Sequence, residues 1–148
     1  SPLHKQTKRN YIERMNNEKV NCSKVAKKYE KEYWDGDRKF GYGGYKYIPG
    51  RWKEVAQKLI NTYKLKSGSS VLDVGCGKGF LLYDFTQSVS GVEVTGVDIS
   101  EYAIEHGKEE VKSYLQVCNA QKLPFGFKWY ELCVPFNCNL FIGKYLGV

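Results

Sequence analysis

Hydrophobic positions in the second half of the chain follow two alternating periods, and the alternation predicts its elements. Short apolar or β-branched runs at residues 71–74, 92–98 and 114–118 are typical of buried strands. Between these runs, apolar residues recur at helical spacing over about 80–88 and 101–113. Strands and helices in this alternating order predict an α/β fold with a doubly wound parallel sheet.

The first half of the chain has a weaker pattern, which predicts helices on either side of a long loop. Apolar residues within 24–33 lie on one side of a short amphipathic helix, and a second helix is predicted over 51–63. We therefore expect two parts: a helical arm over residues 1–66 and the α/β sheet over residues 67–148.

Residues 33–52 are rich in both glycine and aromatic side chains. Glycine shapes a loop rather than a helix, and Tyr and Trp offer flat, amphipathic contact surfaces. One interpretation is an ordered loop whose rings pack on the core, and the other is a lid over a ligand. If the stretch is a lid, the candidate polar contacts are Tyr42, Tyr45, Lys46 and Arg51.

The net charge of +7 is unevenly distributed between the two parts. Residues 1–66 hold 17 Lys and Arg against 7 Asp and Glu, whereas residues 67–148 hold 6 against 9. A basic arm can bind nucleic acid or another anion, but a solvated helical face explains the same composition. Nucleic acid is therefore a partner that the sequence allows without favouring it.

A glycine-rich turn lies between the first predicted strand and its helix, and it reads Asp73-Val74-Gly75-Cys76-Gly77-Lys78-Gly79. Such a turn presents backbone N–H groups to a ligand at the carboxyl end of a strand. The spacing Gly-x-Gly-x-Gly differs from the Gly-x-Gly-x-x-Gly of dinucleotide enzymes. Asp73 is a poor neighbour for a pyrophosphate and a good one for a cationic ligand, which disfavours an NAD-dependent reductase.

The next two strands also end in polar residues. Asp98 ends the second strand, where its two carboxylate oxygens match the vicinal hydroxyls of a ribose. Asn119 and Ala120 follow the third strand and precede Leu123-Pro124-Phe125. Because the carboxyl ends of parallel strands share one edge of a sheet, these residues and the glycine turn are expected to lie together.

These segments together resemble the class I S-adenosylmethionine (SAM)-dependent methyltransferases. The first motif of that family reads hydrophobic-Asp-x-Gly-x-Gly-x-Gly, and its third strand usually ends in Asp-Ala before Leu-Pro-Phe, where this chain has Asn119. The resemblance implies a Rossmann-like fold, SAM as cofactor with S-adenosylhomocysteine as product, and methyl transfer to a small-molecule acceptor. The cofactor-binding residues that it implies are Asp73, Gly75, Cys76, Gly77, Gly79, Asp98, Ile99, Asn119, Ala120 and Asn137.

The resemblance weakens after residue 125. Residues 129–137 align with the family's fourth strand, with Glu131 in the place of an Asp and Pro135 inside the strand. Family members continue with further strands, so we expect a domain truncated after its fourth strand, whose exposed sheet edge suits a homodimer. Two alternatives stay open: a truncated, non-catalytic protein that binds SAM or S-adenosylhomocysteine, and a nucleic-acid methyltransferase, which is less favoured.

No residue is identified as a catalytic base. His4 lies near the N-terminus, and His106 lies on a helix predicted to face away from the cofactor. The five cysteines lack metal-site spacing, and Cys76 lies in the ligand loop, so we expect no metal, no disulfide framework and a reducing cytoplasm. No apolar run approaches the length of a membrane span.

Overall fold

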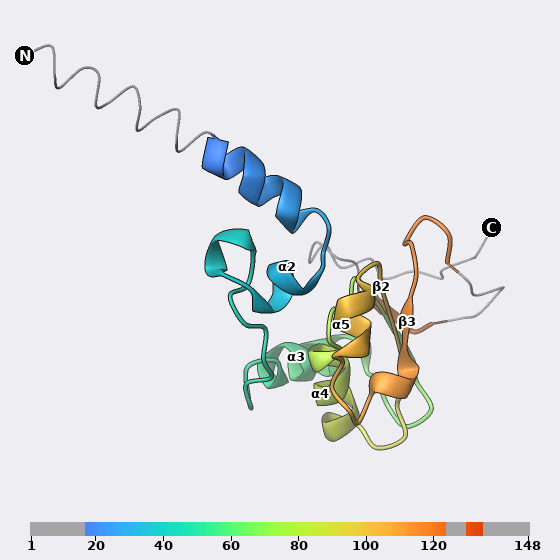
Figure 1. Cartoon of the computed structure of the whole chain (residues 1–148). Coiled ribbons are helices and arrows are strands. Elements are labelled where there is room, and N and C mark those ends of the chain that lie inside the picture. The colour runs from blue at the N-terminus through green and yellow to red at the C-terminus, as the bar shows by residue number, and fades with distance from the viewer. Residues whose placement is uncertain (1–16, 124–129, 135–148) are drawn as a thin grey trace, which may run out of the picture. The chain divides into compact units, whose positions relative to one another are not determined.

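The computed structural model describes residues 17–123 and 130–134, which are coloured in Figure 1. The chain divides into two compact units, Ser1–Tyr45 and Lys46–Val148, and each is described by itself. The functional boundary that we expected at residue 66 stays a prediction.

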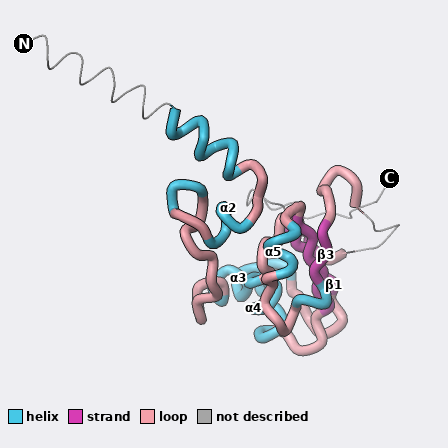
Figure 2. Tube along the Cα trace, in the orientation of Figure 1, coloured by secondary structure: helices cyan, strands magenta, loops and turns pink. Residues whose placement is uncertain are grey.

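The second unit is built on one parallel sheet, whose strands are drawn in magenta in Figure 2. Its strands, in the order β3-β2-β1-β4, are β1 (Ser70–Val74), β2 (Glu93–Asp98), β3 (Leu115–Val117) and β4 (Leu132–Val134). In the central strand β1, Val71 pairs with Val94 of β2 on one side and with Leu132 of β4 on the other. The predicted parallel α/β sheet is confirmed, and β4 forms one edge of its described part.

Three α-helices accompany the sheet within the residues that the structure describes: α3 (Lys53–Tyr63), α4 (Phe80–Ser88) and α5 (Glu101–Glu105). The prediction for α4 is confirmed, but the prediction of one helix over 101–113 is wrong, because α5 ends at Glu105. The N–H of Gly107 reaches back to Ile104, and the N–H of Lys108 donates to the carbonyl of Lys78 at 2.8 Å instead of continuing the helix. After this turn, a short 3₁₀ helix over Lys112–Tyr114 leads into β3.

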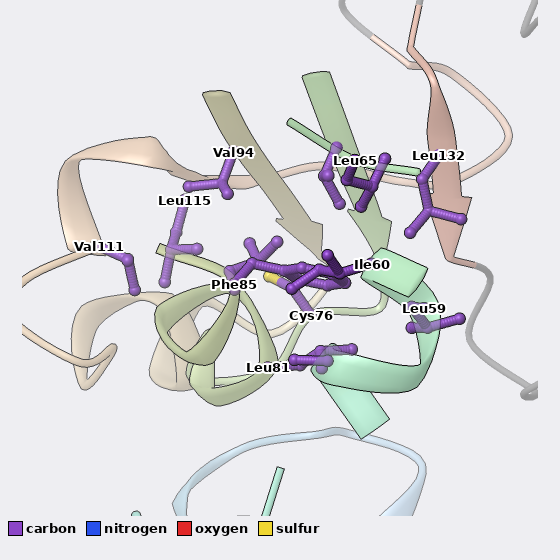
Figure 3. Packing of buried hydrophobic residues seen from close by; sticks show 13 residues of the cluster. Leu59, Ile60, Leu65, Cys76, Leu81, Phe85, Val94, Val111, Leu115 and Leu132 are labelled. Atoms are coloured by element: carbon purple, nitrogen blue, oxygen red, sulfur yellow. The ribbon is translucent and has the colours of Figure 1, made fainter. Parts of the chain in front are cut away.

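Successive residues of β1 are buried on opposite faces of the sheet, as the two-residue period of a strand requires. Val71 belongs to the larger apolar cluster with Leu59 and Ile60 of α3 and Phe85 of α4, as Figure 3 shows for the helical residues. Leu72 belongs to a smaller cluster with Val97, Tyr130 and Cys133. Burial of these apolar side chains is the main stabilising contribution to this unit.

The first unit corrects the prediction of one helix over residues 24–33. A helix covers 17–26, the chain then turns at Tyr29, which has φ +51°, and α2 (Lys31–Asp35) follows. The Trp34 indole N–H donates to the Tyr29 carbonyl at 3.1 Å, and this bond stabilises the break. A short 3₁₀ helix over Arg38–Phe40 comes next.

The aromatic side chains of the first unit pack on one another. Trp34 is only 5% exposed, and Tyr42 stacks on it with ring centroids 5.3 Å apart and an interplanar angle of 9°. Tyr45 contacts both rings, and its backbone N–H donates to the Asp35 carboxylate at 2.9 Å. The rings therefore form an aromatic cluster within this unit, and the choice between the two interpretations of residues 33–52 stays open. Across the described residues, no helix has the length and apolar character needed to cross a bilayer.

Candidate cofactor-binding site

The glycine-rich turn after β1 adopts a conformation that requires glycine. Gly75, Gly77 and Gly79 have φ values of +82°, +56° and +76°, in a region that L side chains rarely adopt. The N–H groups of Gly75 and Cys76 both donate to the Val97 carbonyl, at 2.7 and 3.0 Å. The turn is therefore fastened to β2, the neighbouring strand, and α4 begins directly after it.

Asp98, the last residue of β2, is hydrogen-bonded to this turn. One carboxylate oxygen accepts the N–H of Gly77 at 2.8 Å, and the other accepts the N–H of Ser100 at 2.8 Å. The side chain is 5% exposed. Burial raises the pKa of Asp98 above its ordinary value, while the Ser100 and Gly77 N–H groups oppose that rise because they stabilise the ionised form.

Asp73 pairs with Gly96 in the register of β1 and β2, and its side chain is 6% exposed. Burial, with a smaller effect from the charge of Asp98, raises the pKa of Asp73 to about 7. Unlike Asp98, it takes part in no hydrogen bond through its carboxyl group within the described part of the chain. The site thus holds a carboxyl group whose charge has no protein partner there.

Cys76 and Lys78 are the two non-glycine residues inside the turn, and both are buried. The Cys76 thiol lies 3.6 Å from the Gly77 carbonyl, and burial raises the pKa of this thiol well above its ordinary value. A protonated, buried thiol is a poor nucleophile, and the predicted cofactor contact of Cys76 stays a prediction. The Lys78 ammonium lies 5.8 Å from the ring centroid of Tyr102.

The residues predicted after the second and third strands lie at the same edge of the sheet. The N–H of Cys118, just after β3, donates to the Asp98 carbonyl at 2.9 Å. Ile99 is 57% exposed, although it is apolar and follows a buried aspartate. Asn119 and Ala120 are also exposed, and the Asn119 side-chain oxygen accepts the N–H of Gln121 at 2.9 Å.

The described structure does not test the remaining predicted site residues. Asn137 lies outside the described residues. Tyr42 and Tyr45 belong to the first unit and take part in its aromatic cluster. Lys46 and Arg51 belong to the second unit and are exposed. The lid function of these four residues stays a prediction.

Sequence reasoning missed a polar contact beside the turn. The Tyr47 hydroxyl donates to one carboxylate oxygen of Asp84 at 2.7 Å, and this bond is the main reason why the pKa of Tyr47 rises to about 12. The second Asp84 oxygen is buried without a partner among the described residues. The Lys108 ammonium lies 4.7 and 4.2 Å from the ring centroids of Tyr47 and Tyr83. Asp84 is the one charged residue of an otherwise apolar or neutral helix, a signal that could have drawn attention to it.

Comparisons with known proteins agree with the motif-based resemblance. Residues 65–128 match the family model of a methyltransferase domain. A demethylmenaquinone methyltransferase of Symbiobacterium thermophilum is 36% identical over 84 residues, which cover 51% of this chain and 34% of that protein. An S-adenosyl-L-methionine-dependent Diels-Alderase of Talaromyces variabilis is 32% identical over 96 residues, which cover 59% and 30% of the two chains.

Among solved structures, a SAM-dependent methyltransferase from Aquifex aeolicus is similar with a TM-score of 0.47 and 25% identity, over 59% of this chain and 50% of that one. The chain spans about a third of the length of the two curated relatives. The matched segment contains β1, the glycine turn, α4, β2, α5 and β3, and therefore Asp73 and Asp98. Residues 65–128 are thus similar to the methyltransferase domain family.

Proposed function

We propose that this chain binds SAM at the glycine turn and takes part in methyl transfer to a small-molecule acceptor. The observation that carries the proposal is a pair of buried carboxyl groups, Asp73 and Asp98, at the ends of neighbouring strands beside a turn of three glycines with positive φ. SAM has an ammonium and a sulfonium group, a ribose diol and no phosphate. A phosphate ligand would be repelled by both carboxylates once they are ionised.

Each part of SAM has a group of fitting chemistry at this edge. The unpartnered carboxylate of Asp73 suits a cationic group, and the glycine turn permits close approach of the ligand to the backbone. The Asp98 oxygens accept one N–H each and retain lone pairs for ribose hydroxyls. The exposed Ile99 offers apolar contact to an adenine ring, and Asn119 can bond its amino group through the remaining lone pair of its amide oxygen.

In this proposal SAM supplies an electrophilic methyl group, and the residues of the chain bind and orient it. Holding an acceptor atom within about 3–3.5 Å of the reacting carbon, in line with the leaving group, supplies much of such a rate enhancement. We assign no general base: the Cys76 thiol at this edge is buried and its pKa is raised, and Asp98 is bonded to two backbone N–H groups. Asp73 itself is assigned to binding.

The first experiment is calorimetric titration of the whole chain with SAM, S-adenosylhomocysteine and NAD. We expect micromolar binding of the two adenosyl ligands and none of NAD. Asp73→Asn should weaken the binding of SAM, because it removes the negative charge that we propose to pair with a cationic group of SAM. The matched control is Glu93→Gln, which neutralises a carboxylate at the opposite end of β2 and should leave the affinity unchanged. Binding of NAD in preference to both adenosyl ligands would overturn the proposal.

A second candidate is SAM binding without methyl transfer. It is favoured by the similarity to a relative that is named a SAM-dependent Diels-Alderase rather than a methyltransferase. The two candidates differ in turnover, so the test is formation of S-adenosylhomocysteine from SAM with a panel of acceptors. The panel should begin with quinols and sterols, because a demethylmenaquinone methyltransferase and a cycloartenol-C-24-methyltransferase are among the relatives. Tight SAM binding with no turnover on any acceptor would favour the second candidate.

A further inference from the structure

We propose that Asp98 is a positioning residue that holds the glycine turn in its binding conformation before any ligand is bound, in addition to its contact with the ligand. The inference deepens the proposed function and rests on it for the ligand measurements below. A measurement on the ligand-free chain tests it independently.

The hydrogen bonds of the turn support this role. Gly77 is buried, and the one acceptor for its N–H among the described residues is the Asp98 carboxylate, at 2.8 Å. The other tethers of the turn to β2, from Gly75 and Cys76, both end on the carbonyl of Val97 and precede Gly77. Without the carboxylate, the middle of the turn would lose its connection to β2 and leave a buried N–H without a partner, which is strongly unfavourable.

Asp98 is itself fixed by further hydrogen bonds, which a residue that positions another requires. Its backbone carbonyl accepts the N–H of Cys118 after β3, and its second carboxylate oxygen accepts the N–H of Ser100. The Ser100 hydroxyl in turn accepts the N–H of Ala103 and caps α5. The carboxylate therefore joins the turn, the sheet and the start of α5, and its charge makes both of its N–H bonds stronger than neutral ones.

This positioning role predicts that binding affinity falls for two separate reasons when the Asp98 side chain is removed. A ligand loses any bond to its ribose hydroxyls, and it also meets a turn that must first be ordered. Only the second loss applies to a ligand without those hydroxyls. Titration of wild type and Asp98→Ala with S-adenosylhomocysteine and with its 2′,3′-dideoxy analogue therefore separates the two effects.

We expect Asp98→Ala to lower the affinity for the dideoxy analogue about tenfold, which corresponds to one lost buried hydrogen bond. The affinity for S-adenosylhomocysteine should fall further. Asp98→Asn keeps one acceptor oxygen and should show an intermediate loss. Glu93→Gln, at the opposite end of β2, is the matched control and should leave the affinity for both ligands unchanged. An Asp98→Ala variant that binds the dideoxy analogue as tightly as wild type would overturn the proposal.

Amide hydrogen exchange on the ligand-free chain supplies the independent readout. Gly77 should be protected in wild type and exchange at least about tenfold faster in Asp98→Ala, with Asp98→Asn intermediate. Protection of the β1 amides shows that each variant is folded, and Asp73→Asn serves as the control for loss of a neighbouring carboxyl group that does not bond Gly77. Unchanged protection of Gly77 in both Asp98 variants would refute the positioning role. If no adenosyl ligand binds wild type, the proposed function fails while the exchange measurement still decides the role of Asp98.

Discussion

The carboxyl ends of β1 and β2 each have a buried aspartate, and the two carboxyl groups differ in their hydrogen bonds to the rest of the fold. Asp98 accepts two backbone N–H groups, whereas the carboxyl group of Asp73, buried to the same degree, accepts none within the described residues. The fold therefore compensates the buried charge of Asp98 in part, since burial still raises its pKa, and leaves that of Asp73 uncompensated. Burial alone would assign both residues the same role, and only their hydrogen bonds distinguish them.

The largest expected effect comes from disturbing the packing at Gly96, a β2 residue that pairs with Asp73 of β1 and lies two positions before Asp98. A Cβ at Gly96, which pairs with Asp73, would lie 2.7 Å from a Leu115 methyl and 2.8 Å from the Cys76 sulfur. We expect Gly96→Val to lower the free energy of unfolding by about 3 kcal/mol, because these buried neighbours have little room to move. Chemical denaturation measures this change, and Thr95→Val, at the partly buried adjacent position, should change stability far less. Equal midpoints for the two variants would contradict the packing at Gly96.

The next prediction is that replacing the two aspartates by asparagine changes the free energy of unfolding in opposite directions. Asp98→Asn should lower the free energy of unfolding by about 1 kcal/mol, because it removes one of two buried, charge-assisted hydrogen bonds, a loss that relief of the buried charge partly offsets. Asp73→Asn should raise it by a similar amount at pH 8, because it removes a buried charge that has no partner. Thermal or chemical unfolding of the two variants at pH 8 measures both changes. Changes of the same sign would remove the distinction between the two residues.

The Asp73 effect should also depend on pH. The pKa of Asp73 is about 7 in the folded chain and 3.8 without the fold, so the folded state binds more protons between these values. This residue therefore makes stability fall as pH rises from about 4 to about 7. The gain from Asp73→Asn should be full above pH 7 and absent below about pH 4, as unfolding curves across that range would show.

The third effect concerns ligand affinity. If Asp73 pairs with a cation of SAM, it must be ionised, and binding should strengthen about tenfold between pH 6 and pH 8. Calorimetry in matched buffers measures this dependence, together with release of protons on binding at neutral pH. Asp73→Asn is the control, because it should bind weakly with a flat pH profile. An equally steep profile in that variant would assign the titration to another group.

The smallest effect tests a third buried carboxylate, Asp84, which has one oxygen bonded and one without a partner among the described residues. Tyr47→Phe removes the bonded donor and should lower stability by about 1 kcal/mol. The loss should be the same from pH 6 to pH 9, because the pKa of Tyr47 is about 12 and its hydroxyl stays protonated. In a double-mutant cycle with Asp84→Asn, the two losses should not add. Additive losses would show that the bond contributes little.

Residues 70–98 were predicted well because their signals are local. The apolar run of β1, the glycines after it and the helical period of α4 each specify their own backbone. The end of α5 was not predicted, because the Lys108 N–H that ends the helical pattern bonds Lys78, which is distant in sequence. The break at Tyr29 has a local cause that helical spacing does not reveal, because its carbonyl accepts the N–H of the Trp34 side chain five residues later.

The candidate site shows the same limit. Spacing placed Asp73 and Asp98 at strand ends, and the register confirms that position for both. Spacing could not show that one carboxylate is bonded to the turn and the other is not, because that depends on where the Gly77 N–H points after the turn folds. The ligand contacts of both residues stay predictions.

Because Cys76 is buried in the glycine turn, the rate at which its thiol is chemically modified can report how often the turn opens. Its sulfur is buried and contacts the Gly77 carbonyl of the turn, while Cys22 and Cys118 are half-buried and therefore accessible to reagents. Under an excess of thiol reagent, those two should be modified quickly, whereas Cys76 and Cys133, the buried cysteines of the described residues, react only as fast as the fold around them opens. In a Cys133→Ala variant the slow modification of Cys76 reports opening of the turn, and a ligand that closes over the turn would slow it further.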